Sequence, residues 1–139
     1  MFKKISDKIL INLNTLKGTG KPFTEVYDYI TLEGETYPYC CFEATEFSAV
    51  TLDNCSNERT YTYEIVVLQE ASSRKNAKDI IQKSIDDIIE VIDKNRTLGL
   101  SEVKRVEPVS GRIEPFIIKN GKTLVGTLIV NVITYYELI

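Results

Sequence analysis

The sequence contains no histidine. Histidine is the commonest general base, proton shuttle and metal ligand in proteins, so its absence removes all three at once. Catalytic triads built on an imidazole are therefore excluded. The remaining routes to catalysis are paired carboxylates, a cysteine nucleophile or a reactive lysine.

The chain also lacks a long apolar run. The apolar residues 9–11 are soon followed by Asn12 and Asn14, so this run is too short for a signal peptide. No stretch approaches the ~18 apolar residues that span a bilayer. We therefore expect a protein that is made and used in the cytosol and that has no membrane partner.

An excess of positive charge is missing as well. The chain has 17 Lys and Arg against 20 Asp and Glu, which gives a net charge of −3. Surfaces that bind nucleic acid carry a clustered excess of Lys and Arg, and the one local cluster, Lys3, Lys4 and Lys8, is typical of a solvated helix face. A mildly acidic subunit suits a channel through which DNA passes only as cargo.

What is present is the composition of an ordinary globular domain. Of the 139 residues, 43% are hydrophobic and 27% are charged. A chain of this length can bury most of the apolar surface that its unfolded form exposes. We predict a single domain over residues 1–139.

The first half of the chain predicts a helix followed by a strand hairpin. Apolar residues recur every three or four positions over residues 2–16, and the segment Lys17 to Pro22 ends that helix. After a short extended piece at 26–32, residues 37–52 suit a long strand that bends or bulges near Glu46. Residues 53–57 have a turn composition, and residues 59–70 alternate as a half-buried strand does.

The second half predicts a long helix and further strands. Residues 72–95 carry one broad isoleucine stripe, with Ser72 or Ser73 as the N-cap, and this stripe must lie on a sheet. Two extended stretches follow at 103–109 and 112–119, each with a proline that favours a sheet edge or a bend. Asn120-Gly121 predicts a tight hairpin into a strand over 122–138. The fold class is α+β, with a mostly antiparallel sheet and two helices on one face.

The carboxylates that stand closest together are Asp86, Asp87 and Glu90. They lie on the polar side of the long helix, opposite the isoleucines, so we expect them to be solvated and not to act as a catalytic pair. A small metal-dependent hydrolase that uses them is a remote alternative.

Cysteines and glycines offer no stronger site. Cys40 and Cys41 are neighbours in a predicted strand, so their side chains point to opposite faces and cannot share a metal, and with Cys55 they are an odd number of free thiols. The Gly18-x-Gly20-Lys21 run has neither the preceding strand nor the following Ser or Thr of a phosphate-binding loop. We predict no catalytic residues, no metal and no cofactor.

Three short motifs, in this order and spacing, resemble a known family. They are Asn57-Glu58-Arg59-Thr60-Tyr61-x-Tyr63 at the start of the second hairpin strand, Asp93-Lys94-Asn95-Arg96-Thr97-Leu98-Gly99 at the end of the long helix, and Val106-Glu107-Pro108 on the next strand. With the order of elements over residues 37–138, they resemble the tail-terminator (tail-completion) proteins of long-tailed, lambda-like bacteriophages.

This resemblance implies a structural role in a virion. Such proteins form rings, typically hexamers, that cap the head-proximal end of the tail tube, end its polymerisation and join the tail to the head. The implied partners are other copies of the chain, the tail-tube protein and a neck or head-completion protein, in a virion assembled in the host cytoplasm. The alternative is a neck or head-completion protein that binds the portal or adaptor, because such subunits share a similar α+β plan.

The turn between the hairpin strands is the predicted contact loop, because it is polar and long enough to move. Tyr61 and Tyr63 can pack in the core or at a subunit interface, where tyrosine is favoured. One of the two patches that a ring needs is expected at the exposed hairpin edge, and the other is not located. The predicted interface residues are Asn54, Ser56, Asn57, Glu58, Arg59, Tyr61 and Tyr63.

Overall fold

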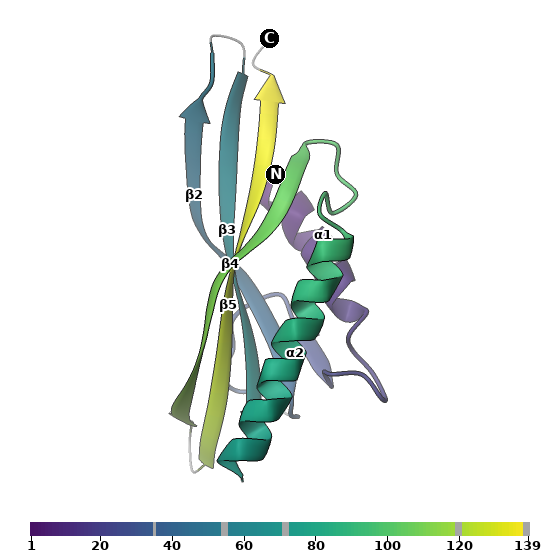
Figure 1. The fold of residues 1–139 in the computed structure, drawn as a ribbon, viewed down its shortest axis with the longest axis vertical. Coiled ribbons are helices and arrows are strands. Elements are labelled where there is room, and N and C mark those ends of the chain that lie inside the picture. The colour runs from purple at the N-terminus through teal and green to yellow at the C-terminus, as the bar shows by residue number, and fades with distance from the viewer. Residues whose placement is uncertain (35, 54–55, 71–72, 119–120, 138–139) are drawn as a thin grey trace.

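The structure, a computed structural model, describes residues 1–34, 36–53, 56–70, 73–118 and 121–137. In these residues the helices α1 (Phe2–Asn14) and α2 (Arg74–Lys94) accompany five strands. The predicted α+β class is confirmed, and Figure 1 shows long strands that run the length of the molecule with both helices on one side. The strands are β1 (Glu25–Tyr27), β2 (Tyr39–Thr51), β3 (Ser56–Glu70), β4 (Val103–Ile118) and β5 (Gly121–Glu137).

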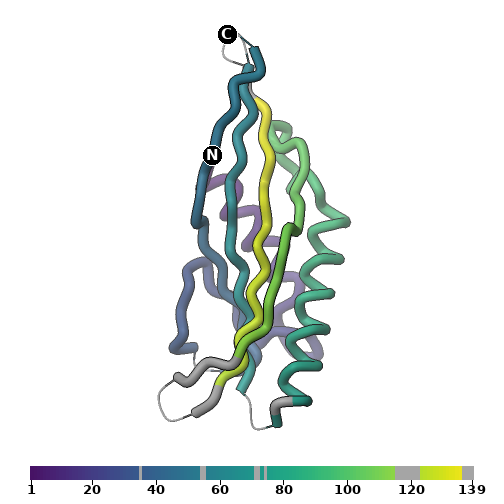
Figure 2. Tube along the Cα trace, turned by 60° about the vertical axis from the view of Figure 1, so that its left-hand side comes forward, coloured from purple at the N-terminus to yellow at the C-terminus, as the bar shows by residue number. Residues whose placement is uncertain are grey.

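The strands form one sheet in the order β1-β2-β3-β5-β4. β1 pairs with β2 in parallel at three positions, and the other neighbouring strands are antiparallel. The predicted hairpin of β2 and β3 is present, and β4 with β5 makes a second antiparallel pair at the opposite edge (Figure 2). The sheet is therefore mostly antiparallel, as predicted.

The predicted irregularity in the first hairpin strand is also present. The register of β2 on β3 shifts between Ala44 and Glu46, so Thr45 is the extra residue of a β-bulge. Side chains of a regular strand alternate between the two faces, but the extra residue resets that alternation. Glu43 and Glu46, three positions apart, consequently point to the same face of the sheet.

The region after the long helix differs from its prediction. The two extended stretches expected at 103–109 and 112–119 are one strand, β4, whose register on β5 shifts between Pro108 and Ser110. The strand continues through the predicted break by means of a β-bulge. Pro108 lies on an edge strand, where prolines are tolerated. The predicted Asn120-Gly121 turn falls partly outside the described residues.

The connection after α1 is closed by its own backbone. Gly18 and Gly20 have φ angles of 126° and 74°, a region that favours glycine. The Gly18 N–H donates to the Phe23 carbonyl at 3.0 Å, and the Phe23 N–H donates to the Leu16 carbonyl at 3.0 Å. The Gly18 to Lys21 run thus serves a tight loop, and the extended piece expected at 26–32 is shortened to Glu25–Tyr27.

Both helices pack on the same face of the sheet, as predicted, and they share one core with it. α2 lies over Gly126 of β5, where an added Cβ would overlap Cγ2 of Ile81 and lie 3.0 Å from Cδ1 of Ile85. The missing side chain therefore lets the helix approach the sheet closely. The helix residues buried in this core are Ile5, Ile9, Leu13, Ala77, Ile81, Ile88 and Ile92.

The other face of the sheet carries a smaller cluster at one end. There the segment after β1 covers a patch around Tyr39, whose hydroxyl donates to the Thr31 carbonyl at 3.0 Å. The two neighbouring cysteines are divided between the faces as predicted, Cys40 in the core under the helices and Cys41 in this cluster. In the described residues, no helix is long and apolar enough to cross a membrane.

Candidate functional site

Two of the three neighbouring carboxylates of α2, those of Asp87 and Glu90, are held by lysines, and Asp86 lines a groove between α2 and the sheet. Asp87 lies 3.1 Å from Lys83, and Glu90 lies 2.8 Å from Lys94. The hydrogen bond from Lys94 lowers the pKa of Glu90, which is the opposite of the shift that a general acid needs. Over the ranges that the structure describes, no group of three His, Cys, Asp or Glu residues could hold a metal ion.

The thiols of Cys40 and Cys41 are buried and kept protonated. Burial raises the pKa of Cys41 to about 11 and the pKa of Cys40 well above its usual range. A cysteine nucleophile acts as the thiolate, which these surroundings disfavour. Cys55 lies outside the described residues.

The predicted interface residues are divided between the surface and the core. Tyr61 and Tyr63 are buried beneath α1, where the ring of Phe2 meets Tyr61 edge to face with ring centroids 4.6 Å apart. Both side chains therefore pack in the core, which is one of the two placements that the sequence predicts. Ser56 is also buried, and its hydroxyl donates to Asp53 at 2.9 Å.

The other predicted interface residues lie nearer the surface. Asn57, Glu58 and Arg59 are half-buried, and Glu58 lies 3.1 Å from Lys104 of β4. Asn54 lies outside the described residues. The strand ends that flank this turn stand at one end of the molecule, beyond the helices (Figure 1). Whether the turn contacts a partner stays a prediction.

One unpaired sheet edge is the outer half of β2. In the described residues β1 pairs with β2 only at positions 39–41, so residues 42–51 have no strand on their outer side. Phe47 is 49% exposed, and Glu43 and Glu46 are exposed. Phe47 lies opposite Tyr61, on the helix side of the sheet, whereas Glu46 lies opposite Thr62, on the other side. The edge thus presents an apolar side chain on one face and acidic groups on the other.

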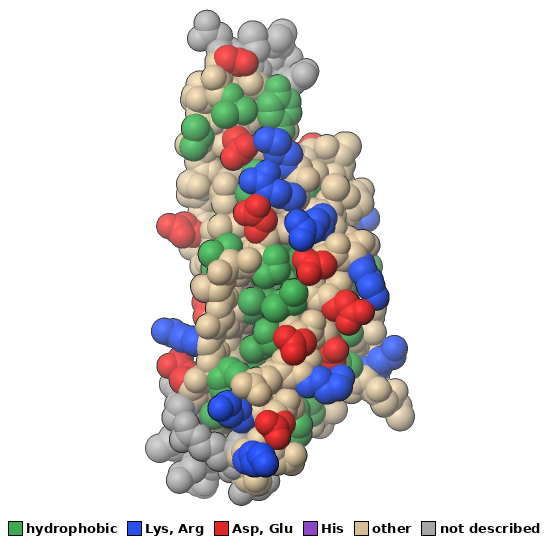
Figure 3. Space-filling view, viewed as in Figure 1, with side chains coloured by type: hydrophobic (Ala, Val, Ile, Leu, Met, Phe, Trp, Pro, Cys, Tyr) green, Lys and Arg blue, Asp and Glu red, His purple; other side chains and the backbone are tan. Residues whose placement is uncertain are grey.

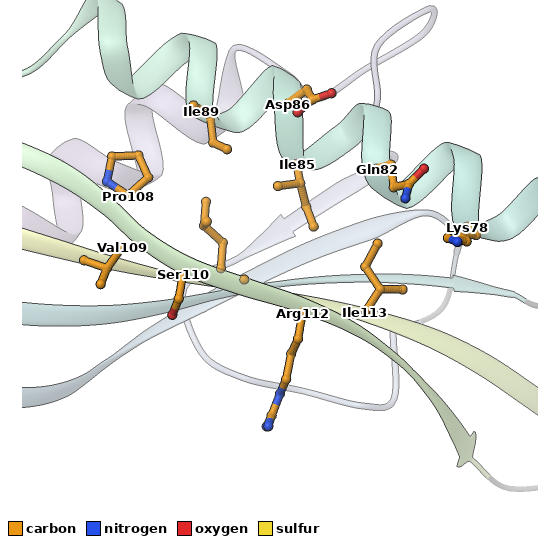
Figure 4. Close-up of a pocket in the computed structure, with 12 residues that line it drawn as sticks. Lys78, Gln82, Ile85, Asp86, Ile89, Pro108, Val109, Ser110, Arg112 and Ile113 are labelled. Carbon is orange, nitrogen blue, oxygen red and sulfur yellow. The ribbon is translucent and has the colours of Figure 1, made fainter.

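The opposite edge is β4, where a groove separates the strand from α2. The groove has a volume of about 770 Å³, and Figure 4 shows Ile85 and Ile89 of α2 and Ile113 of β4 on its walls. Figure 3 shows a patch of hydrophobic side chains in the middle of this face, bordered by charged side chains on the side of α2. The groove is therefore partly apolar, with Lys78, Gln82 and Asp86 along its helix side. It is open and lies at a sheet edge, where proteins commonly bind other chains.

Comparison with known proteins gives a likeness in fold. No family model matches the chain, and no curated protein matches it. A similar fold occurs in a chain of the virion of a native gene transfer agent particle. That match has a TM-score of 0.52 at 10% sequence identity, and it covers 92% of this chain and 84% of that chain. At this identity the likeness shows a shared fold.

The sequence predicts a contact surface at the hairpin, but it does not predict the groove between β4 and α2. The signals for it were weak: Ile85 and Ile89 lie at the border of the helix stripe, and Pro108 marks an edge strand. Only the spatial approach of α2 to β4 brings these residues together.

Proposed function

We propose that this chain is a structural subunit of a phage-like virion that acts as a tail terminator. It forms a ring, a hexamer as in the family that it resembles, on the head-proximal end of the tail tube. The ring ends polymerisation of the tube and joins the tail to the head. The observation that carries the proposal is the fold shared over 92% of the chain with a virion chain of a gene transfer agent particle.

The two sheet edges support a ring. A closed ring with one kind of interface needs two different complementary patches on each subunit. The outer half of β2 and the groove of β4 and α2 differ in shape and lie at opposite edges of one sheet. A subunit with both edges open can be joined on each side by another copy.

The proposed role requires no chemistry from the chain. Asp87 and Glu90 of α2 are paired with lysines, and burial disfavours the thiolate forms of Cys40 and Cys41. The proposed partners are further copies, the tail-tube protein and a neck or head-completion protein, with DNA passing through the lumen as cargo. The location follows as the tail or neck of a virion assembled in the host cytoplasm.

The experiment that tests the proposal is co-expression with the tail-tube protein, followed by light scattering and electron microscopy of the tubes. We expect a complex with a mass of about six copies at one tube end and tubes of limited length. Tubes that grow without limit, together with binding to the portal or adaptor instead, would favour the neck or head-completion role. The same virion fold is compatible with that second role.

A further inference from the structure

We propose that neighbouring copies of this chain join head to tail through their sheet edges, with the outer half of β2 of one copy against β4 of the next. In this arrangement Phe47 of the first copy enters the groove between β4 and α2 of the second. The inference rests on the proposed ring and names its subunit interface. The occupant of the groove is therefore a second copy of this chain.

The faces of the two edges match on the helix side of the sheet. Phe47 points to the helix side, because it lies opposite Tyr61, which is buried under α1. A strand added beside β4 would place its helix-side residues next to Ile113, which lies opposite Gly126 beneath α2. This is where the groove lies, so an aromatic side chain on the added strand would fill apolar space that is open in the single copy.

Charged groups of both edges lie on the other side of the sheet. Glu43 and Glu46 share the helix-free face because of the bulge at Thr45, and β2 carries no lysine or arginine. On the same face β4 presents Arg105 and Arg112, which lie opposite Ile133 and Thr127, and Glu107 and Glu114, which pair with these arginines. The acidic edge of β2 would therefore meet a mixed edge, in which the arginines are the groups that can bind its carboxylates.

Arg112 keeps capacity for a partner. The side chain of Arg112 is 72% exposed and lies 3.5 Å from Glu114 through its Nε atom. A guanidinium has five N–H donors, so further donors remain for a carboxylate of a neighbouring copy. Bidentate pairs of arginine with carboxylate are among the stronger and more specific polar contacts.

Joining the edges would also pair backbone groups that lie unpaired at the sheet edges of a single copy. Each open edge strand has a row of backbone N–H and C=O groups on its outer side, which can template uncontrolled pairing. Because the β2 edge carries glutamates and no lysine or arginine, pairing β2 with β2 would bring like charges together and is disfavoured. The same chemistry that attracts β2 to β4 therefore specifies the head-to-tail order that a ring requires.

A charge-swap experiment tests this interface. Glu46→Lys, Arg112→Glu and the double variant are compared with wild type by light scattering, with and without the tail-tube protein. Each single change should raise the concentration for half-maximal assembly by about tenfold or more, since like charges then face each other. The double variant should restore assembly. Lys3→Glu, at an α1 side chain that is 87% exposed, makes the same change in charge as Arg112→Glu and should have no effect.

A mixing experiment tests the head-to-tail order. Phe47→Asp disrupts the β2 edge and leaves the groove intact. Val109, which is 55% exposed, lines the groove, so Val109→Asp disrupts the groove and leaves the β2 edge intact. Each variant alone should remain monomeric. When the two variants are mixed, the intact β2 edge of Val109→Asp can bind the intact groove of Phe47→Asp. The mixture should therefore form a one-to-one dimer that grows no further, because both remaining edges are disrupted.

The outcomes separate the interface from the proposed function. Rings that form normally in both Glu46→Lys and Arg112→Glu would overturn this interface and leave the tail-terminator role standing. A wild-type chain that stays monomeric with and without the tube protein would overturn both. The charge variants change exposed side chains only, so they decide the question even where Phe47→Asp fails to fold.

Discussion

The hydroxyl of Tyr63 on β3 joins the N-terminal helix to the centre of the sheet through Ser6. The two oxygens lie 2.8 Å apart, and the Tyr63 hydroxyl donates to the Phe2 carbonyl at 3.1 Å. A phenol has one hydrogen to donate, so the Ser6 hydroxyl donates to Tyr63 in this arrangement. Burial raises the pKa of Tyr63, which keeps the phenol protonated as this pair of bonds requires.

Tyr63→Phe should therefore destabilise the protein. The change removes both hydrogen bonds but leaves the ring in the core, so we expect a loss of about 1–2 kcal/mol in the free energy of unfolding. Urea denaturation measures this loss. Tyr29→Phe, at an exposed tyrosine, is the matched control and should change the free energy by less than about 0.5 kcal/mol. Equal effects of the two changes would contradict a bonding role for the Tyr63 hydroxyl.

Gly126→Ala tests how closely α2 approaches the sheet. The added methyl group would overlap Cγ2 of Ile81, so we expect overpacking to cost about 1–3 kcal/mol. Calorimetry or urea denaturation of a double-mutant cycle checks the cause. In an Ile81→Ala background, which removes the overlapping atom, the penalty of Gly126→Ala should be smaller by at least about 0.5 kcal/mol. An unchanged penalty would place the clash elsewhere.

The main elements of this fold were predictable because their sequence patterns are regular. The isoleucine stripe of α2 indicated a helix on a sheet, and alternation from Arg59 to Glu70 indicated a half-buried strand. The bulge near Glu46 was predictable because the alternation is broken there. In contrast, the proline and glycine of β4 suggested two stretches, whereas pairing with β5 carries the strand through as one.

The candidate site was harder to predict from the sequence than the fold. A groove depends on which residues of distant segments meet, and nothing in the local pattern pairs Ile85 of α2 with Ile113 of β4. The parallel pairing of β1 with β2 was likewise not predicted, since a three-residue strand leaves almost no periodic signal. Tyr61 and Tyr63 belong to an alternating pattern, which predicts that one face of the strand is buried. The pattern does not indicate whether that face is covered by this chain or by a partner.

The buried thiol of Cys41 predicts a loss of stability in alkaline solution. Its folded pKa of about 11 lies above the ordinary value of 9.0, mainly because burial disfavours the charged form. The protonated thiol therefore stabilises the fold fully below pH 9, and this contribution is lost as the pH rises from about 9 to 11. Urea denaturation across this range should show a falling free energy of unfolding.

Cys41→Ser provides the check on that assignment. Serine keeps the approximate size but does not titrate in this range, so its cost should be the same at every pH. We expect the free energy of the variant to fall less steeply between pH 9 and 11 than that of wild type. The remaining slope includes Tyr39, whose burial raises its pKa to about 12. Parallel curves for the two proteins would contradict the assignment to Cys41.

The turn between β2 and β3 is predicted to contact the tail tube. Replacing residues 54–57 by a short Gly-Ser turn should abolish capping of the tube, measured as tube length by electron microscopy. Part of any loss in stability has a known source, because the replacement removes the partly buried hydrogen bond from Ser56 to Asp53, worth about 1 kcal/mol. Ser56→Ala removes the same bond and keeps the rest of the turn, so it should weaken the fold similarly while tubes stay capped. If the Gly-Ser variant also caps tubes normally, the contact with the tube lies on another part of the subunit, and the polar turn serves the hairpin alone.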